Sequence, residues 1–135
     1  MTGRNELTTW TPGELQQIGG AEELRLSSRR PDGSLRPYVT MWVVQAGDGL
    51  YVRSAYGADN PWYRRATAAG AGRIRAGGIE RDVSFAQAEA EAEAGADIDA
   101  AYHAKYDRYG PRIVGSVTGP AVYGLTIRLV PEPKE

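Results

Sequence analysis

The 135-residue chain has no cysteine and a single histidine, His103, and these two shortages limit its chemistry. Without cysteine, it can form no disulfide, thiolate nucleophile or cysteine-ligated metal site. One histidine also excludes a metal site built from several histidines and leaves only one arrangement of a serine–histidine triad. We therefore expect no metal centre.

Long apolar runs are missing as well. No segment approaches the roughly 20 residues needed to cross a bilayer. The first residues, MTGRNELTTWTPGEL, also lack the apolar stretch of a secretory signal. The length and the 41% hydrophobic content fit one domain with its own core. We expect a single soluble, cytoplasmic domain over residues 1–135, with no membrane partner.

Lysine is scarce, and arginine carries most of the positive charge. The net charge is −1, yet residues 25–82 hold ten arginines and five acids, whereas residues 83–107 hold six acids and one lysine. Arginine binds phosphate or carboxylate through two parallel hydrogen bonds, so this choice indicates anion recognition. A coding bias that raises Arg, Ala and Gly together is the competing explanation. Because the whole chain is not basic, we expect no nucleic-acid partner.

Turn-forming and alternating segments predict a mainly β fold with short helices. TPGE, residues 11–14, is a capping box that predicts a helix from Pro12 to Ile18. Six strands favour a six-stranded split β-barrel over a βαβ sheet. Strands are expected at residues 22–28, 37–46 and 50–56, joined as a meander by the PDGS and GDG turns, and at 73–76, 79–85 and 121–130. Further helices are expected over 61–69 and 97–109, the latter capped by Asp97, while 86–96 fits either a strand or a helix.

Several residues of types that often occur in catalytic or ligand-binding sites are better explained here by a structural role. His103 lies between two tyrosines of a predicted helix with no nucleophile beside it, so we interpret it as a surface or packing residue. Glu89, Glu91 and Glu93 would share one face of a strand and look like a solvated edge. The glycine-rich GAGRIRAGG leads into a strand, which argues against a nucleotide loop. Catalytic residues are therefore not predicted.

The stretch LYVRSAYGADNPWYRRA, residues 50–66, places arginines beside aromatic residues. If the Val52 side faces the core, Arg53 points outward or into a cleft between subunits. Arg64 and Arg65 lie near a helix N-terminus, where free amides also favour anions. These residues suggest a pocket for an anion attached to a flat ring. The alternative is that Trp62 simply plugs the end of the barrel.

The order of motifs resembles the split-barrel proteins that bind flavins, in particular the deazaflavin-dependent nitroreductases. The corresponding pieces are SSRRPDGSLRP, TMWVVQAGDGLYVRS and YGADNPWYRRA, and the likeness covers about residues 23–85. An uncharacterised bacterial branch of that superfamily is closer still, through WVV, LYVRS, PWYRRA and AGG. The chain departs from the nitroreductase pattern at Arg53, before the serine, and at Tyr56, where a small polar residue is usual.

This resemblance implies a split β-barrel that binds deazaflavin or FMN and forms a homodimer with the cofactor at its interface. It implies a reductase-like protein that transfers hydride to a small-molecule substrate such as a quinone or nitro compound. The alternative is a non-redox small-molecule-binding or cofactor-independent tailoring protein on the same fold. Outward-facing Trp42 and Val44 also predict a dimer. From the residues and the resemblance together, the cofactor-binding candidates are Arg29, Arg30, Arg36, Arg53, Ser54, Tyr56, Gly57, Trp62, Tyr63, Arg64 and Arg65.

Overall fold

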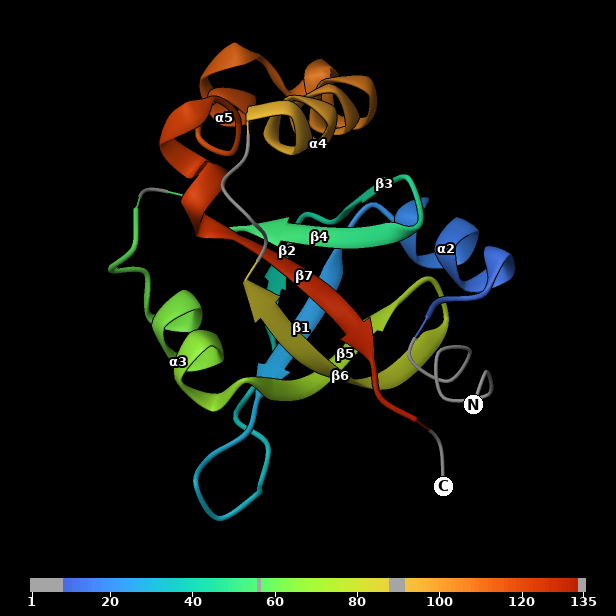
Figure 1. The fold of residues 1–135 in the computed structure, drawn as a ribbon, viewed down its shortest axis with the longest axis vertical. Coiled ribbons are helices and arrows are strands. Elements are labelled where there is room, and N and C mark those ends of the chain that lie inside the picture. The colour runs from blue at the N-terminus through green and yellow to red at the C-terminus, as the bar shows by residue number, and fades with distance from the viewer. Residues whose placement is uncertain (1–8, 56, 88–91, 134–135) are drawn as a thin grey trace.

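One antiparallel sheet of seven strands forms the centre of the molecule in a computed structural model, which describes residues 9–55, 57–87 and 92–133 (Figure 1). The strands lie in the order β2-β1-β5-β6-β7-β4-β3. Their bounds are β1 Leu24–Ser28, β2 Val39–Met41, β3 Val44–Ala46, β4 Gly49–Arg53, β5 Ala71–Ala76, β6 Ile79–Gln87 and β7 Thr126–Pro131.

The two edge strands, β2 and β3, are separated in the chain only by Trp42 and Val43. The sheet must therefore curl until its edges meet at one flank, which is the geometry of a split barrel. The predicted fold class is confirmed, with seven strands in place of six. The predicted strand 37–46 is divided because its first half pairs with β1 and its second half with β4.

Helices cover the ends and one face of the barrel. Their bounds are α2 Pro12–Gly19, α3 Pro61–Ala69, α4 Ala92–Tyr106 and α5 Pro111–Gly115, with short 3-10 turns η1 Asp107–Tyr109 and η2 Pro120–Leu125. The predicted capping box is confirmed, since Thr11 Oγ1 accepts from the Glu14 backbone N–H at 3.1 Å and Glu14 accepts from the Thr11 N–H at 2.9 Å. Gly70, in a left-handed conformation with φ of 72°, ends α3 as expected.

The largest errors in the predicted boundaries concern α4 and the last strand. Helix α4 begins at Ala92 and not after Asp97, because alanine and glutamate favour helix and extend it toward the N-terminus. Segment 86–96, which fitted either a strand or a helix, therefore contains the end of β6 and the start of α4. Residues 88–91 lie outside the described residues. The last strand begins at Thr126 because Pro120 starts the 3-10 turn η2 before it.

The core has two parts. The barrel interior is filled by strand residues such as Leu26, Val52 and Ile74, closed by α2 and α3. A second cluster lies between β3 and the helices α4 and α5 and contains Val44, Tyr102 and Tyr106. Trp42 stacks on the Tyr106 ring with centroids 4.0 Å apart. The expectation that Trp42 and Val44 face outward is therefore wrong, because α4 covers them.

Candidate functional site

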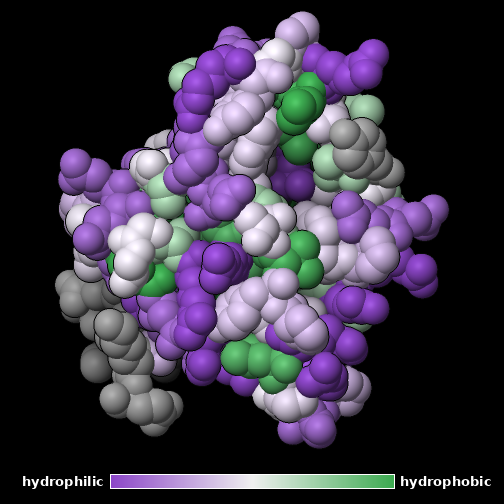
Figure 2. All heavy atoms as spheres, turned by 180° about the vertical axis from the view of Figure 1, so that it is seen from behind, coloured by the Kyte–Doolittle hydropathy of each residue, from purple (hydrophilic) through white to green (hydrophobic). Residues whose placement is uncertain are grey.

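Five of the predicted arginines line one open cleft between the β1–β2 loop and α3. Its volume is about 890 Å³, and no carboxylate of the described residues lines it. Figure 1 places α3 and this loop next to each other at the lower left. In Figure 2, which shows the molecule from behind, hydrophilic side chains gather at the lower right, over these two segments. The arginines are Arg29, Arg30 and Arg36 from the loop and Arg64 and Arg65 from the helix.

Local hydrogen bonds build the loop that carries three of these arginines. The Asp32 carboxylate accepts from the Ser34 backbone N–H at 2.9 Å and from its hydroxyl at 2.7 Å. Gly33 has φ of 89°, a value that favours glycine, so the predicted turn at residues 31–34 is confirmed. Arg29 donates to the Gly33 carbonyl at 2.8 Å and Arg30 to the Leu35 carbonyl at 3.0 Å. These two side chains thus help to hold their own loop.

One acid lies near the edge of the cleft. Arg29 Nη2 is 3.4 Å from Asp82 Oδ1, and Arg73 Nε is 2.7 Å from the same oxygen. The hydrogen bond from Arg73 holds the pKa of Asp82 below its usual value, so the carboxylate is charged at neutral pH. Its charge is shared between two guanidinium groups and offsets only part of the positive charge of Arg29.

The other three arginines have unused donors. Arg64 and Arg65 are exposed, and neither makes an ion pair or a side-chain hydrogen bond to the described residues. The Arg36 Nε is buried and has no hydrogen-bond partner there. A buried donor without an acceptor is unfavourable, and an anion in the cleft would reach this nitrogen only if the loop moved, because the atom is closed off from solvent. The cleft therefore offers several free guanidinium donors to an anion.

A second, smaller hollow of about 370 Å³ lies at the split of the barrel. Pro61 lines the arginine cleft and Trp62 lines this hollow, so the two spaces lie on either side of the first turn of α3. The hollow is lined by β2 and the residue after it, by the end of β4, by the start of α3, and by α4 and α5. These residues are Val39, Thr40, Met41, Trp42, Arg53, Ala55, Asn60, Trp62, Tyr102, Ile113, Ser116 and Val117.

Trp62 belongs to both the core and the hollow. Only 9% of it is exposed, it packs within the barrel core, and its ring meets the Tyr63 ring edge-on with centroids 5.9 Å apart. It also forms part of the wall of the hollow. The two interpretations of this residue are therefore compatible, because one face fills the barrel end and another borders open space.

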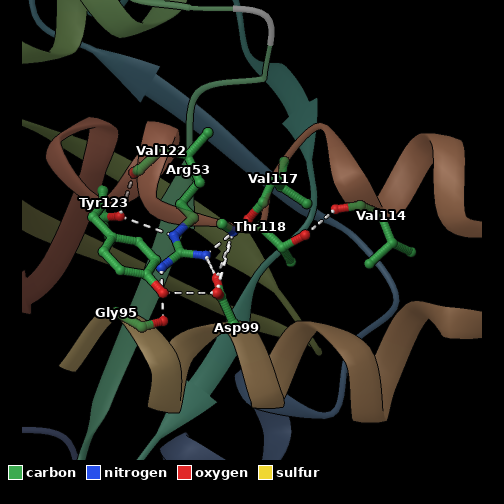
Figure 3. Close-up of polar contacts among 10 residues, drawn as sticks. Arg53, Gly95, Asp99, Val114, Val117, Thr118, Val122 and Tyr123 are labelled. Atoms are coloured by element: carbon green, nitrogen blue, oxygen red, sulfur yellow. Dashed lines mark hydrogen bonds and ion pairs between the residues drawn. The ribbon is translucent and has the colours of Figure 1, made fainter. Parts of the chain in front are cut away.

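Arg53 is only 3% exposed, so the expectation that it points outward is wrong (Figure 3). Helix α4 covers this face of β4. Arg53 Nη1 donates to Asp99 at 2.5 Å and to the Val117 carbonyl at 2.8 Å, and Nε donates to Thr126 Oγ1 at 2.9 Å. Nη2 donates to the Gly95 carbonyl at 3.2 Å. Four of its five N–H groups are thus engaged by the protein, which leaves little for a phosphate.

Ser54, Gly57 and Tyr63 line neither space. The Ser54 hydroxyl donates to the Gly57 carbonyl at 2.6 Å, which ties the loop after β4 to itself. The Tyr63 hydroxyl donates to the Gly124 carbonyl at 3.3 Å within the core. Tyr56 lies outside the described residues. His103 is exposed, with Nδ1 2.8 Å from Asp107 Oδ1, as expected for a surface residue. The side chains of Glu89, Glu91 and Glu93 also lie outside the described residues.

Sequence reasoning missed two residues, Asp99 and Tyr102. Asp99 is the ionic partner of Arg53 but lies 46 residues further along the chain, and no local signal connects the two. Tyr102 is fully buried, which raises the pKa of its hydroxyl, and this hydroxyl has no hydrogen-bond partner among the described residues. Tyr102 and Tyr106 are four residues apart, so the sequence indicates that they share one face of a helix. It does not indicate that this face borders a hollow.

The described part of the chain contains no group of three or more histidine, aspartate or glutamate side chains that could hold a metal ion. None of its helices has the length and apolar character needed to span a membrane.

A sequence model of the family described as "Uncharacterized protein conserved in bacteria (DUF2255)" matches residues 14–129. The chain belongs to this family. A search of curated proteins finds no match. The uncharacterised bacterial branch indicated by the motifs is therefore represented by a defined family.

Solved structures share the fold at low sequence identity. A conserved hypothetical protein from Mycobacterium tuberculosis is 10% identical with a TM-score of 0.62, covering 96% of this chain and 84% of that one. An F420 reductase is 18% identical with a TM-score of 0.51, covering 93% and 97%. A FAD-binding protein from Mesorhizobium loti is 12% identical with a TM-score of 0.53, covering 94% and 92%. The resemblance to the flavin- and deazaflavin-binding split barrels is confirmed at the level of the fold.

Proposed function

We propose that the chain binds a flavin-type cofactor, either a deazaflavin or FMN, with the anionic part of its tail in the arginine cleft. The observation that carries this proposal is the gathering of five arginines around one cleft without a lining carboxylate. Split barrels described as an F420 reductase and as a FAD-binding protein support the choice of cofactor class. The cofactor phosphate would meet Arg64 and Arg65 first, since both are exposed and unpaired.

The residues of the cleft fit this cofactor chemically. A guanidinium group offers parallel donors that match the oxygens of phosphate or carboxylate, and its charge does not depend on pH. Arg64 and Arg65 supply exposed guanidinium donors that have no partner among the described residues. Trp62 lies one residue from the cleft, so a ring joined to a bound tail would be bordered by its indole.

We further propose that the protein is a reductase that acts on a small organic acceptor such as a quinone or nitro compound. A bound flavin or deazaflavin would supply the hydride. The residues of this chain would hold the tail, orient the ring against Trp62 and exclude water with the apolar walls of the hollow. The competing function is a non-redox binding protein that uses the hollow without a cofactor.

We also propose a homodimer. Val39 and Ile113 are 37% and 45% exposed, and large exposed hydrophobic side chains are often covered by a second subunit. Light scattering should then give about twice the chain mass of 14.6 kDa. A particle of one chain mass at tens of micromolar protein would exclude a stable dimer.

Titrating the purified protein with FMN and with F420 tests the proposed cofactor. The double variant Arg64→Ala, Arg65→Ala should bind the preferred cofactor roughly ten- to a hundredfold more weakly, because charge-assisted hydrogen bonds contribute about 1.5–3 kcal/mol each. Its melting temperature should not change, since both side chains are exposed and unpaired. Arg25→Ala is the matched control, because Arg25 is an exposed arginine outside the cleft. If wild-type protein binds neither cofactor at millimolar concentration, the non-redox function is favoured.

A further inference from the structure

Three aromatic side chains form a continuous array from the hollow to the molecular surface. Trp42, which lines the hollow, stacks on the Tyr106 ring with centroids 4.0 Å apart and planes within 5° of parallel. The centroid of the Tyr109 ring lies 5.4 Å from that of Trp42 and 6.3 Å from that of Tyr106. These separations are typical of rings in contact. The aromatic array of Trp42, Tyr106 and Tyr109 thus begins at an open space and ends at a side chain that is 43% exposed.

Packing accounts for most of this array but not for its outer end. Tyr106 is fully buried in the second core cluster, and Trp42 is partly buried against that cluster. Tyr109, in contrast, is one of three large hydrophobic side chains that the described residues leave exposed. Its ring therefore adds little to the core, and its position is better explained by what its hydroxyl contacts.

The Tyr109 hydroxyl is bound to a proton acceptor. It donates to one oxygen of the Glu22 carboxylate, and Arg108 Nη2 donates to the other oxygen. The hydrogen bond from Tyr109 holds the pKa of Glu22 below its usual value, so this carboxylate is charged at neutral pH and can take a proton. Arg108 also lies over the Tyr109 ring, with its guanidinium carbon 4.8 Å from the centroid, and it keeps the carboxylate in place.

The buried tyrosines of the same cluster have no such acceptor. The Tyr106 hydroxyl donates to the Glu22 and Val43 carbonyls at 2.8 and 3.1 Å, and a backbone carbonyl is too weak a base to take the proton. The Tyr102 hydroxyl is closed off from solvent and has no partner among the described residues. Loss of one electron makes a tyrosine hydroxyl strongly acidic, so a tyrosine bound to a base is easier to oxidise. Tyr109 is therefore the most readily oxidised tyrosine of this cluster.

We propose that the aromatic array carries one-electron oxidation away from the hollow to the surface. An organic radical in the hollow takes one electron from Trp42 and becomes a closed-shell anion, and Trp42 regains an electron from Tyr109. As Tyr109 gives up this electron, its hydroxyl proton passes to the Glu22 carboxylate, which leaves a neutral tyrosyl radical at the surface. The walls of the hollow are thereby protected from lasting oxidation. The presence of such a radical in the hollow rests on the proposed function, whereas the transfer from Trp42 to Tyr109 needs only these side chains.

Pulse radiolysis of the purified full-length protein, without any cofactor, tests this transfer. The azide radical made by the pulse oxidises tryptophan faster than tyrosine at neutral pH, and Trp42 is the least buried of the three tryptophans. The absorption of the tryptophanyl radical should decay while that of the tyrosyl radical rises. Its rate should not change with protein concentration, because the transfer is internal. A rate proportional to protein concentration would contradict the proposal.

Tyr109→Phe removes the outer end of the array. The fold should survive, because this side chain is largely exposed. Most of the fast tyrosyl signal should be lost, and the tryptophanyl radical should persist. Tyr38→Phe is the matched control, since Tyr38 is a partly exposed tyrosine beside an arginine, with the guanidinium carbon of Arg75 5.1 Å from its ring centroid, and lies outside the array. Equal tyrosyl yields in the two variants would rule out Tyr109 as the end of the transfer.

Glu22→Gln tests the proton acceptor separately. It keeps the size of the side chain and an oxygen that accepts a hydrogen bond, but an amide is not a base. The rate of transfer should fall about tenfold or more, since a positioned base accelerates proton transfer. Glu23→Gln, at the neighbouring exposed acid, is the control and should leave the rate unchanged. An unchanged rate in Glu22→Gln would show that Glu22 does not take the proton.

Another pair of rings could receive the oxidation instead. Trp62 and Tyr63 lie in the barrel core with centroids 5.9 Å apart. A nitroso spin trap followed by peptide mass spectrometry locates the tyrosyl radical, and the label should lie on Tyr109. A label mainly on Tyr63 would overturn the proposed route. The cofactor titrations are independent of this measurement, so the proposed flavin site and the aromatic array can each fail without the other.

Discussion

Arg53 in β4 and Asp99 in α4 form an ion pair, 2.5 Å from Nη1 to Oδ1, that fastens the helices α4 and α5 to the barrel (Figure 3). The Arg53 side chain is fully buried, while 19% of the Asp99 side chain is exposed. Asp99 also accepts from the Gly119 backbone N–H at 3.2 Å and from the Tyr123 hydroxyl at 3.0 Å. One carboxylate thus joins β4, α4 and the segment before β7.

Removing one partner of this pair should be strongly destabilising. Arg53→Ala leaves Asp99 and two backbone carbonyls without their donor, and breaking a buried pair in this way costs about 3–5 kcal/mol. Urea unfolding measures the loss. Arg75→Ala is the control, since its ion pair with Glu80 is about half exposed and should contribute roughly 0–1 kcal/mol. Equal effects of the two substitutions would mean that the buried pair does not hold the helices in place.

Trp62 should contribute to stability as well as to binding. Trp62→Ala removes a side chain that is part of the barrel core, which typically costs about 3–5 kcal/mol of unfolding free energy. Thermal melts and urea unfolding provide the measurement. Trp62→Phe should lose much less stability, because it fills most of the same space. A change below about 1 kcal/mol in Trp62→Ala would show that the indole serves only the hollow.

The partly buried Lys105 should make the free energy of unfolding depend on pH. Burial lowers the pKa of Lys105 from 10.5 to about 8, and its ammonium lies 2.6 Å from the Val43 carbonyl. Between these two pKa values the unfolded chain holds a proton that the folded chain has released, so stability rises with pH in this window. Relative to Lys105→Met, the wild type should gain roughly 1 kcal/mol from pH 7.5 to pH 10, allowing for the solvent exposure of a half-buried side chain.

Urea unfolding of both proteins across this pH range makes the comparison. Burial raises the pKa of Tyr102 and of Tyr106, so both disfavour the folded state when they ionise above pH 10. Their effect is present in both proteins and cancels in the difference. A wild type that lost stability relative to Lys105→Met over this range would contradict the lowered pKa.

Gly95 should not tolerate a larger residue. A Cβ at this position would lie 2.5 Å from ring atoms of Tyr123, which would displace the Tyr123 hydroxyl from Asp99. We expect Gly95→Ala to lower the unfolding free energy by about 1–3 kcal/mol. Gly115→Ala is the control, because nothing lies within 4 Å of a Cβ there. If calorimetry finds both variants as stable as the wild type, Tyr123 does not support the Asp99 contacts.

The sequence predicted elements that depend on local chemistry. The capping box at Thr11 and the helix from Pro61 to Ala69 follow from residues within a few positions of each other. The turn at residues 31–34 is equally local, with Gly33 at φ of 89°. The many arginines of residues 25–82 indicated anion recognition, and the folded chain brings five of them to one cleft.

Features that depend on distant parts of the chain could not be predicted. Alternation along β4 correctly placed Arg53 opposite Val52, but its burial depends on α4, more than 40 residues later. The division of strand 37–46 likewise depends on where β1 and β4 lie in the finished sheet. The hollow is made by segments from β2 to α5, so no single motif contains it.

The short connection between β2 and β3 limits how the barrel can open. Met41 and Val44 are three residues apart in the chain and lie on opposite edges of the sheet. A chain of that length spans at most about 11 Å when fully extended, so the two edges stay within that distance of each other where the link joins them. Beside Met41 and Trp42, which line the hollow, its width can therefore change more readily through movement of α5, which contributes Ile113, than through separation of the strand edges.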